Sequence, residues 1–353
     1  MLTTALQIFL RSLRVRTTGF KKYSGDAESI CEQVIADCWN ETYFQASTGH
    51  FTQFWTRDFG MQARALMQLG WKDEVRETLV HVLEVFSRAN KICTTVRGTN
   101  VFDFPTYAPD SLALLLHSLR IAKSKSLAQQ HRAFLEQQIS FFIKHVIHPS
   151  TQLVHHEKHF SSMKDHSLRC SSAYDNCMAW LVTEEAKKLG LDCAYAFPKK
   201  KFLHLFWNQT YFLDDSNTKT VAGDANVFPF WTGMISDKKL LSATLTKIKT
   251  AGLDRPLPLK YTAAQPSHKK IWQSMLAPNY EGTTVWTLLG GCYLTVLKQV
   301  ENKAMQEAQE RMLQKIEEYK TVLEVFTPEG KPYKSLLYTC DEGMLWAANI
   351  LAP

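Results

Sequence analysis

The sequence contains no C-x-x-C pair, although eight of its 353 residues are cysteines. Zinc ribbons and redox-active dithiols use that close spacing, so neither is expected here. Free thiols are the default for a chain of this length in a reducing compartment, whereas disulfide frameworks are typical of small secreted domains. We therefore predict a cytoplasmic protein whose cysteines bind no metal.

Short motifs that mark nucleotide-binding sites and common hydrolases are also absent. The sequence has no G-x-G-x-x-G, G-x-x-x-x-G-K-[ST], G-x-S-x-G or H-E-x-x-H, which removes the usual signatures of dinucleotide, phosphate, serine-hydrolase and zinc-protease sites. His155 and His159 are four residues apart, but no carboxylate partner on a helix accompanies them. We expect no cofactor and no metal.

The sequence also lacks a long hydrophobic run and a concentrated patch of charge. No segment approaches the ~18 uninterrupted apolar residues that suggest a membrane span. The formal net charge of +7 arises from 41 basic and 34 acidic residues, which are dispersed apart from Lys199–Lys201 and Lys269–Lys270. Nucleic-acid-binding proteins concentrate positive charge on one face. We therefore expect neither a membrane nor a nucleic acid as a partner; the sequence does not fix the oligomeric state.

The N-terminal segment has two interpretations. It carries Arg11, Arg14 and Arg16 with no acidic residue before Asp26, a composition found in organelle-targeting peptides. Alternatively, residues 1–25 form a helical extension packed on the domain. Apolar residues that recur at helical spacing support this second interpretation: Leu2, Leu6, Phe9, Leu10 and Leu13. We favour the packed helix, because no A-x-A cleavage site follows.

Helical patterns cover most of the remaining chain, and apolar residues make up 45% of the whole sequence. Amphipathic segments, whose polar face suits solvent, alternate with segments that are apolar almost all round. The amphipathic segments are 27–39, 73–86, 127–146, 199–207, 237–250 and 302–319. The apolar segments are 58–69, 110–121, 173–189, 227–235, 283–297 and 342–351.

This alternation predicts an all-α fold, an (α/α)6 barrel in which polar outer helices wrap apolar inner helices. A helical solenoid could also give paired helices. However, the segments do not resemble each other, and six pairs are enough to close a ring. Because no domain boundary is visible, residues 1–353 are expected to form a single toroidal domain.

Six short motifs recur just before or at the start of the inner helices, and each places a carboxylate beside an aromatic, amide or hydroxyl residue. They are WTRDF at 55–59, YAPDS at 107–111, AYDN at 173–176, GDAN at 223–226, NYEGT at 279–283 and YTCDEG at 338–343. Free N–H groups and the helix dipole favour acids at helix starts. Chemically diverse loops above matching helices suggest one shared site.

Two carboxylates are the main catalytic candidates. Asp110 opens an apolar helix after a loop rich in aromatic and polar residues, although an Asp in that place is more often an N-cap. Glu324 lies among apolar neighbours in TVLEVF, where burial would raise the pKa of its carboxyl, but it could also be a surface acid on an extended segment. Glu281 competes for the same role, or is an acid stabilised by the dipole of a helix start.

Other motif residues could bind a substrate. Arg57 and Asp58 are adjacent and could hold hydroxyl groups, or they could form a buried ion pair that braces two hairpins. Asp175 and Asp165 have the same ambiguity. Further candidates for contact with a sugar are Trp55, Tyr107, Asn226, Tyr280 and Trp286. Any single aromatic among them is more often part of the core.

Taken in order, the motifs resemble those of the six-hairpin glycosidases from residue 53 to the C-terminus. The resemblance is carried by WTRDF, APDSLALLL, SSMKD followed by AYDNCMAW, GDAN, NYEGTTVW, and LEVFTPEG with YTCDEGMLWAANI. Within this superfamily the motifs resemble those of the catalytic domains of glycogen-debranching α-glucosidases, neutral invertases and the glucosyl- and mannosylglycerate hydrolase group. This resemblance implies the same barrel and a glycosidase activity.

The resemblance also implies roles for individual residues. The general acid of these families opens an inner helix, which corresponds to Asp110, and the general base precedes the last inner helix in an E-x-[FY]-x-x-x-G segment, which corresponds to Glu324. An Arg-Asp pair in the first motif holds sugar hydroxyls and corresponds to Arg57 and Asp58. The acid before the third inner helix corresponds to Asp175.

We therefore expect an inverting glycoside hydrolase that cleaves an α-glucoside-type bond in an oligosaccharide or small glycoside, with Asp110 as acid and Glu324 as base. At residues 280–287 the chain departs from the Y-H-N-G-x-x-W-P pattern of the families, which puts the identity of the sugar in doubt. Two alternatives stay open. One is a sugar epimerase on the same barrel, which needs paired histidines in the cavity; the other is an inactive barrel that binds a glycan or a protein.

Overall fold

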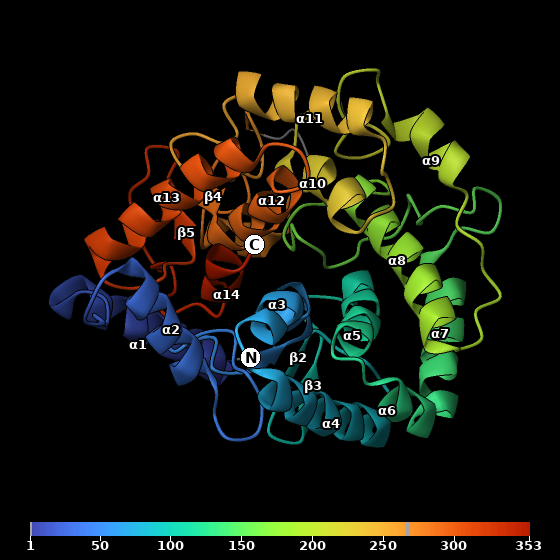
Figure 1. Ribbon diagram of the computed structural model, residues 1–353, viewed down its shortest axis with the longest axis horizontal. Helices are drawn as coiled ribbons and strands as arrows, with labels where there is room; N and C mark the ends of the chain where they lie inside the picture. The colour runs from blue at the N-terminus through green and yellow to red at the C-terminus, as the bar shows by residue number, and fades with distance from the viewer. Residues whose placement is uncertain (1, 266–268) are drawn as a thin grey trace.

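Helices of two kinds alternate along the chain and close into a ring (Figure 1). The computed structural model describes residues 2–265 and 269–353; Met1 and residues 266–268, which the predicted domain also includes, lie outside them. The outer helices are α2 (Ala27–Cys38), α4 (Lys72–Ala89), α7 (Arg132–Val146), α9 (Lys199–Phe206), α11 (Lys238–Thr250) and α13 (Asn302–Tyr319). The inner helices are α3 (Thr56–Gln68), α5 (Pro109–Ile121), α8 (Ala173–Leu189), α10 (Gly223–Trp231), α12 (Thr287–Leu297) and α14 (Ala347–Leu351). The predicted all-α (α/α)6 barrel is confirmed.

The two kinds of helix differ in burial as their sequences predict. On α12, every residue from Thr287 to Leu294 is buried. On α13, by contrast, burial follows a single stripe at intervals of three and four residues, formed by Met305, Ala308, Met312 and Ile316. Such spacing places the apolar residues on one helix face and leaves the rest to solvent. No helix in the described ranges is long and apolar enough to cross a membrane.

The ring closes where the last inner helix meets the first. The Asn349 backbone N–H donates to Gln62 Oε1 at 3.1 Å, and its side-chain amide donates to the Met61 carbonyl at 2.9 Å. Just before α14, Trp346 Nε1 donates to Asp58 Oδ1 at 2.7 Å. In Figure 1 the red α14 accordingly lies beside the blue α3. Buried hydrogen bonds therefore join the two ends of the ring.

Short strands connect neighbouring hairpins ahead of the inner helices. One antiparallel sheet contains β1 (Phe54–Trp55), β2 (Thr95–Arg97) and β3 (Asn100–Phe102), and a second contains β4 (Val285–Trp286) and β5 (Val325–Phe326). In the second sheet Trp286 pairs with Val325, and the Thr287 N–H donates to the Glu324 carbonyl at 3.2 Å. Glu324 is thereby fixed beside the start of α12.

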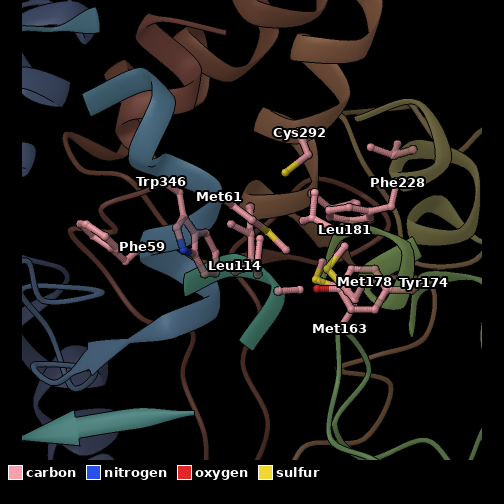
Figure 2. Close-up of a cluster of buried hydrophobic side chains, with 14 of the residues drawn as sticks. Phe59, Met61, Leu114, Met163, Tyr174, Met178, Leu181, Phe228, Cys292 and Trp346 are labelled. Atoms are coloured by element: carbon pink, nitrogen blue, oxygen red, sulfur yellow. The ribbon is translucent and has the colours of Figure 1, made fainter. Parts of the chain in front are cut away.

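An apolar cluster contributed by several inner helices fills the middle of the ring (Figure 2). Its members include Met61 from α3, Leu114 from α5, Leu181 from α8, Phe228 from α10 and Cys292 from α12, each no more than 1% exposed. These residues lie within or beyond the second turn of their helices. The charged residues of the first four motifs lie in the first turns of their helices, and Glu281, Asp341 and Glu342 precede α12 and α14. The polar site and the apolar core therefore occupy different levels of the ring.

Four helical segments differ from the sequence prediction by four or more residues at one end, or are divided in two. Helix α10 covers Gly223–Trp231 instead of 227–235, because GDAN forms its first turn rather than the loop before it. Residues 285–286 form β4, so α12 starts at 287 instead of 283. Gly343, with φ of +64°, interrupts the predicted 342–351 helix, and α14 starts at 347. The predicted 127–146 helix is divided at His131 into α6 (Lys125–Gln130) and α7.

The N-terminal helix α1 (Leu2–Thr18) packs on the ring through a face other than the predicted one. Four of the five apolar residues expected to pack are exposed: Leu6, Phe9, Leu10 and Leu13; the side chain of Leu2 lies outside the described ones. The buried residues are instead Arg11, Ser12 and Val15. The prediction was wrong because the partner surface is polar: Arg11 contacts the carboxylates of Asp341 and Glu342.

Candidate active site

Four consecutive inner helices carry a buried aspartate in their first turn. These residues are Asp58 on α3, Asp110 on α5, Asp175 on α8 and Asp224 on α10. The free N–H groups of a first helical turn favour negative charge. Because α3, α5, α8 and α10 pack side by side in the ring, their first turns gather the four carboxylates into one site.

Asp110 and Arg57 form the centre of this cluster. Arg57 Nε donates to Asp110 Oδ2 at 2.5 Å, and the same oxygen accepts from the Tyr174 hydroxyl at 2.9 Å. The other end of the guanidinium contacts both oxygens of Asp165, at 3.0 and 3.1 Å. Asp110 is completely buried, and burial raises the pKa of its carboxyl although the Arg57 charge opposes that shift. Its second oxygen, Oδ1, has no hydrogen-bond partner among the described residues.

Two structural interpretations of these residues prove wrong. Asp110 is not an N-cap: Ala108 occupies the cap position of α5, and no side chain caps it. Nor do Arg57 and Asp58 brace two hairpins as an ion pair, since among the described residues Arg57 is paired with Asp110 and Asp165. Successive residues on a helix point in different directions, so Arg57 faces α5 while Asp58 faces Trp346.

Asp58 is held between the first and last inner helices. Its carboxylate accepts the hydrogen bond from Trp346 Nε1, and 8% of the residue is exposed. Burial raises the pKa of Asp58 to about 6, against the opposing effects of the Arg57 charge and the Trp346 hydrogen bond. Ionised Asp58 therefore costs folding free energy at neutral pH.

Asp58→Asn should consequently become more stable relative to the native protein as pH rises from about 4 to about 6. A folded pKa above the unfolded value contributes stability below pH ~4 that is lost as pH passes the folded pKa. A pKa of about 6 against the ordinary 3.8 corresponds to about 3 kcal/mol. Asn retains the acceptor for Trp346, so urea unfolding at pH 4.5 and 7 isolates the charge. An equal stability difference at both pH values would contradict this account.

Asp175 forms no ion pair with another described residue. The Ser172 hydroxyl donates to its Oδ2 at 2.6 Å, while its Oδ1 is buried without a hydrogen-bond partner in the described part of the chain. Burial raises the pKa of Asp175 to about 7, and the negative charges of Asp110 and Asp224 act in the same direction; Arg169 opposes them. Asp175 can thus hold a proton near neutral pH and present a free oxygen to a ligand.

Glu324 lies ahead of the last inner helix and is 1% exposed. Three donors surround its carboxylate: the Tyr280 hydroxyl bonds to Oε1, while the Tyr338 hydroxyl and the Asp341 backbone N–H bond to Oε2 at 2.6 and 2.8 Å. Burial, followed by the charge of Asp341, raises the pKa of Glu324 to about 7 despite these hydrogen bonds. The predicted burial of this residue is confirmed, and the surface-acid alternative is wrong.

Glu281 occupies a different setting from the one its sequence suggested. Both carboxylate oxygens accept from the His166 backbone N–H at 2.9 Å, and the Ser167 hydroxyl lies at 3.3 Å. Helix α12 begins six residues later, at Thr287, so the helix dipole that we expected to act on Glu281 is too far along the chain. Burial raises the pKa of Glu281. Its hydrogen bonds tie the 161–170 loop to the fifth hairpin.

A buried charge cluster beside Asp175 was not predicted. Lys164 Nζ lies 2.6 Å from Asp214 Oδ2 and 3.7 Å from Asp224 Oδ1, and Arg169 contacts the same two carboxylates at 3.1 and 2.7 Å. Lys164 is fully buried. Its only sequence signal was its place in SSMKD, because nothing local indicates which acids a loop lysine will meet.

The aromatic candidates divide into two groups. Trp286 and Tyr280 pack against each other with ring centroids 4.7 Å apart, next to Glu324. Trp55 is half-buried and packs against Phe104 at 5.9 Å. Tyr107, by contrast, packs against Phe141 of α7 at 5.6 Å and belongs to the outer layer. Tyr280, Trp286 and Trp55 therefore remain at the site, and Tyr107 does not.

Asn226 is engaged with the backbone. Its amide nitrogen donates to the carbonyls of Phe212 and Ala222 at 3.0 and 2.8 Å, and its oxygen accepts from the Phe212 N–H at 2.8 Å. Both side-chain N–H groups are used in this way, which gives Asn226 a structural role at the start of α10.

Similarity to known proteins is visible in the fold alone. The sequence matches no family model and no curated protein. Among solved structures, the chain is similar to a glycosidase variant, with a TM-score of 0.68, 10% identity and coverage of 92% of this chain and 94% of that one. A GH63 mannosylglycerate hydrolase from Thermus thermophilus, in complex with Tris, matches with a TM-score of 0.62 and 12% identity, over 92% of this chain and 98% of that one. A rhamnosidase from Klebsiella oxytoca with rhamnose bound matches with a TM-score of 0.65 and 12% identity, over 93% of this chain and 64% of that one. The glycosidase-like architecture that the motifs predicted is thereby confirmed.

Proposed function

We propose that this chain is an inverting glycoside hydrolase that cleaves an α-glucoside-type bond in an oligosaccharide or small glycoside. The observation that carries the proposal is a pair of buried carboxyls, Glu324 and Asp175, whose pKa values are both raised to about 7. Titratable groups with such values suit general acid–base chemistry near neutral pH. The shared architecture with structures described as glycosidases supports the same reaction class.

Glu324 is the general base in this proposal. The Tyr280 and Tyr338 hydroxyls donate hydrogen bonds to the carboxylate and fix its orientation. The carboxylate itself can then accept a proton from water. Burial keeps it more basic than a solvated carboxylate. A water activated by Glu324 would attack the anomeric carbon from the face opposite the leaving group.

Two neighbouring aspartates compete for the role of general acid. Asp110, which the family resemblance implies, is ion-paired with Arg57 at 2.5 Å, and the Arg57 charge opposes the rise in its pKa that burial causes. Asp175 has a pKa of about 7, and its buried Oδ1 has no partner among the described residues, so it can arrive protonated. We therefore assign proton donation to Asp175, and we assign Asp110 with Arg57 to binding of sugar hydroxyls.

The order of the helices around the ring suits this assignment. Asp175 lies in the first turn of the third inner helix, and Glu324 precedes the sixth inner helix. The two residues therefore come from opposite sides of the ring of six hairpins. An inverting pair needs its carboxyl groups ~6.5–9.5 Å apart, so that the attacking water fits between the base and the sugar. Asp58, Trp286 and Tyr280 lie between these two sides and would bind the same sugar unit.

The activity should show a narrow bell-shaped pH dependence with its maximum near pH 7. Glu324 must be ionised, so activity falls as pH drops below about 7; Asp175 must be protonated, so activity falls as pH rises above about 7. The kcat profile of the purified protein measures both limbs, which report apparent pKa values of the coupled site. A flat profile between about pH 5 and 9 would rule out this acid–base pair.

A panel of α-glucosides, α-mannosides and α-rhamnosides tests the substrate class. Preferential release of free glucose from α-glucosides supports the proposal. Hydrolysis of another α-glycoside alone would retain the reaction and change the sugar. If no member of the panel is hydrolysed, although the protein is folded, the glycosidase proposal fails and an inactive glycan-binding barrel takes its place.

A sugar epimerase is the second candidate, because one histidine lies beside each of the two tyrosines, Tyr280 and Tyr338, that bind Glu324. The His50 ring lies 5.4 Å from the Tyr338 ring, and the His166 ring lies 6.3 Å from the Tyr280 ring. His117, by contrast, binds Glu185 at 3.0 Å within the helix layer. The pKa of His50 is lowered to about 4 by burial, which disfavours a protonated histidine acid. Conversion of glucose, N-acetylglucosamine or cellobiose into an epimer would favour this candidate.

A further inference from the structure

The buried residues of α1 connect the N-terminal helix with the candidate base. Arg11 is 8% exposed, although it belongs to a helix in which Leu6, Phe9, Leu10 and Leu13 face solvent. Its Nε lies 3.2 Å from Asp341 Oδ1, and its Nη2 lies 3.2 Å from Glu342 Oε1. Its Nη1 donates to the carbonyls of Thr339 and Cys340 at 3.2 and 3.1 Å. One guanidinium thus holds the whole 339–342 segment.

Asp341 passes this contact on to Glu324. The Asp341 backbone N–H donates to Glu324 Oε2 at 2.8 Å, and the Glu324 backbone N–H donates to the Asp341 carbonyl at 3.1 Å. A shift of the 339–342 segment would therefore displace the Asp341 N–H, which donates a hydrogen bond to the Glu324 carboxylate. The charge of Asp341 is also the second-largest cause of the raised pKa of Glu324.

The surroundings of Asp341 form a cradle built for an ionised carboxylate. It accepts from the Ser47 hydroxyl, from the His50 N–H at 3.0 Å and from the Phe51 N–H at 3.1 Å. Gly49 lies so close that an added Cβ would stand 1.8 Å from Asp341 Oδ1. Against the opposing effect of burial, the charges of His50 and Arg11, followed by the Ser47 hydrogen bond, lower the pKa of the Asp341 carboxyl. Arg11 is the cation that balances its charge.

We propose that α1 is a working part of the active site, in which Arg11 is a positioning residue that holds Asp341 and thereby the base Glu324. This proposal rests on the assignment of Glu324 in the proposed function. Arg11 touches no reacting atom; it acts through the 339–342 segment.

The other groups around Glu324 and Asp341 are neutral at the working pH, apart from one acid. Burial raises the pKa values of Tyr280, Tyr333 and Tyr338, and it also raises the pKa of the Cys340 thiol. His50 Nδ1 lies 3.2 Å from both Arg11 and Asp341, and its pKa is lowered to about 4. Glu342, the remaining acid, is held by Arg11 and by Arg14.

Arg11→Met removes this counter-charge and leaves the negative charge of Asp341 beside Glu324 less compensated. Because Asp341 keeps its hydrogen bonds from Ser47, His50, Phe51 and the Glu342 N–H, the proton should go to Glu324, whose pKa should rise by about one unit. The acidic limb of the kcat profile should then move up by about one pH unit, with roughly tenfold lower kcat at about pH 6 and little change in KM.

Arg14→Met is the matched control. Arg14 lies one turn away on α1 and pairs with Glu342 at 2.5 Å, with its side chain half exposed. It should leave the acidic limb unchanged. Arg11→Gln is a second neutral variant that can still donate to a backbone carbonyl, in case the Met variant does not fold. If neither Arg11 variant moves the acidic limb, whether or not the melting temperature falls, Arg11 is structural and the inference fails.

Carbon-13 NMR titration of the glutamate carboxyls, with Glu324→Gln to assign the signal, reads the pKa of Glu324 without any substrate. A higher pKa in the Arg11 variants than in Arg14→Met supports the inference even if the native protein hydrolyses nothing in the panel. An unchanged pKa of Glu324 overturns the inference. This includes the case in which His50 becomes protonated and replaces the positive charge of Arg11. If the native protein is active and the Arg11 variants keep the native pH profile and the native pKa of Glu324, only this inference fails and the proposed function stands.

Discussion

Glu324→Gln should lower kcat by roughly 10²-fold or more, because the amide cannot accept a proton from the attacking water. The amide retains an oxygen of the same size beside Tyr280, Tyr338 and the Asp341 N–H. The melting temperature should therefore not fall, because the neutral amide also removes the cost of ionising a buried carboxyl whose pKa is raised to about 7. KM should also change little, since the base acts in the transition state more than in binding. Steady-state kinetics at neutral pH and a thermal melt measure these quantities.

Glu281→Gln is the matched control for that experiment. Glu281 is also a buried glutamate with a raised pKa, but both its oxygens are occupied by the His166 N–H. Its substitution should mainly disturb the 161–170 loop and raise KM. If Glu281→Gln abolishes turnover while Glu324→Gln is nearly silent, the base belongs to the fifth hairpin and the present assignment is wrong.

Asp175→Asn should lower kcat by roughly 10²- to 10⁴-fold on glycosides with a poor leaving group, because the leaving oxygen then departs without a proton. An activated substrate such as a dinitrophenyl glycoside or a glycosyl fluoride needs no acid. The same variant should cleave it at close to the native rate. The ratio of the two rates separates proton donation from every binding effect, which would reduce both rates.

Asp110→Asn provides the comparison. It removes the charge that Arg57 pairs with at 2.5 Å, while Asp165 still contacts the guanidinium at 3.0 Å. This variant should lose activity on both kinds of substrate and bind the sugar less tightly. If activated substrates rescue Asp110→Asn and do not rescue Asp175→Asn, then Asp110 is the acid, as the resemblance to the six-hairpin glycosidases implied.

The ring of helices was predictable because the spacing of apolar residues along each helix indicates which of its faces are buried. Apolar runs such as α12 and single stripes such as that of α13 identify inner and outer helices without any knowledge of contacts. The first-turn acids followed from the same patterns, whereas the local sequence left burial and surface exposure both open for Glu324. Helix starts were less predictable, because β4 and the φ of Gly343 depend on how the loops pair.

The partners within the site could not be predicted, because they come from residues far apart in the chain. Arg57 meets Asp110 and Asp165 rather than its neighbour Asp58. The contact between Arg11 and Asp341 joins the two ends of the sequence, and α1 was expected to pack through its apolar stripe. Hydrophobic periodicity cannot anticipate a helix that packs through a buried arginine.

Proton NMR of the first sugar released from an α-glucoside tests the central claim most directly. Inversion by Glu324 and Asp175 predicts that β-glucose appears first and that the α-anomer accumulates only by mutarotation. The native protein should give this result at neutral pH, and Glu324→Gln should release no sugar on the same timescale. Initial release of α-glucose would mean retention through a covalent intermediate and would contradict the account.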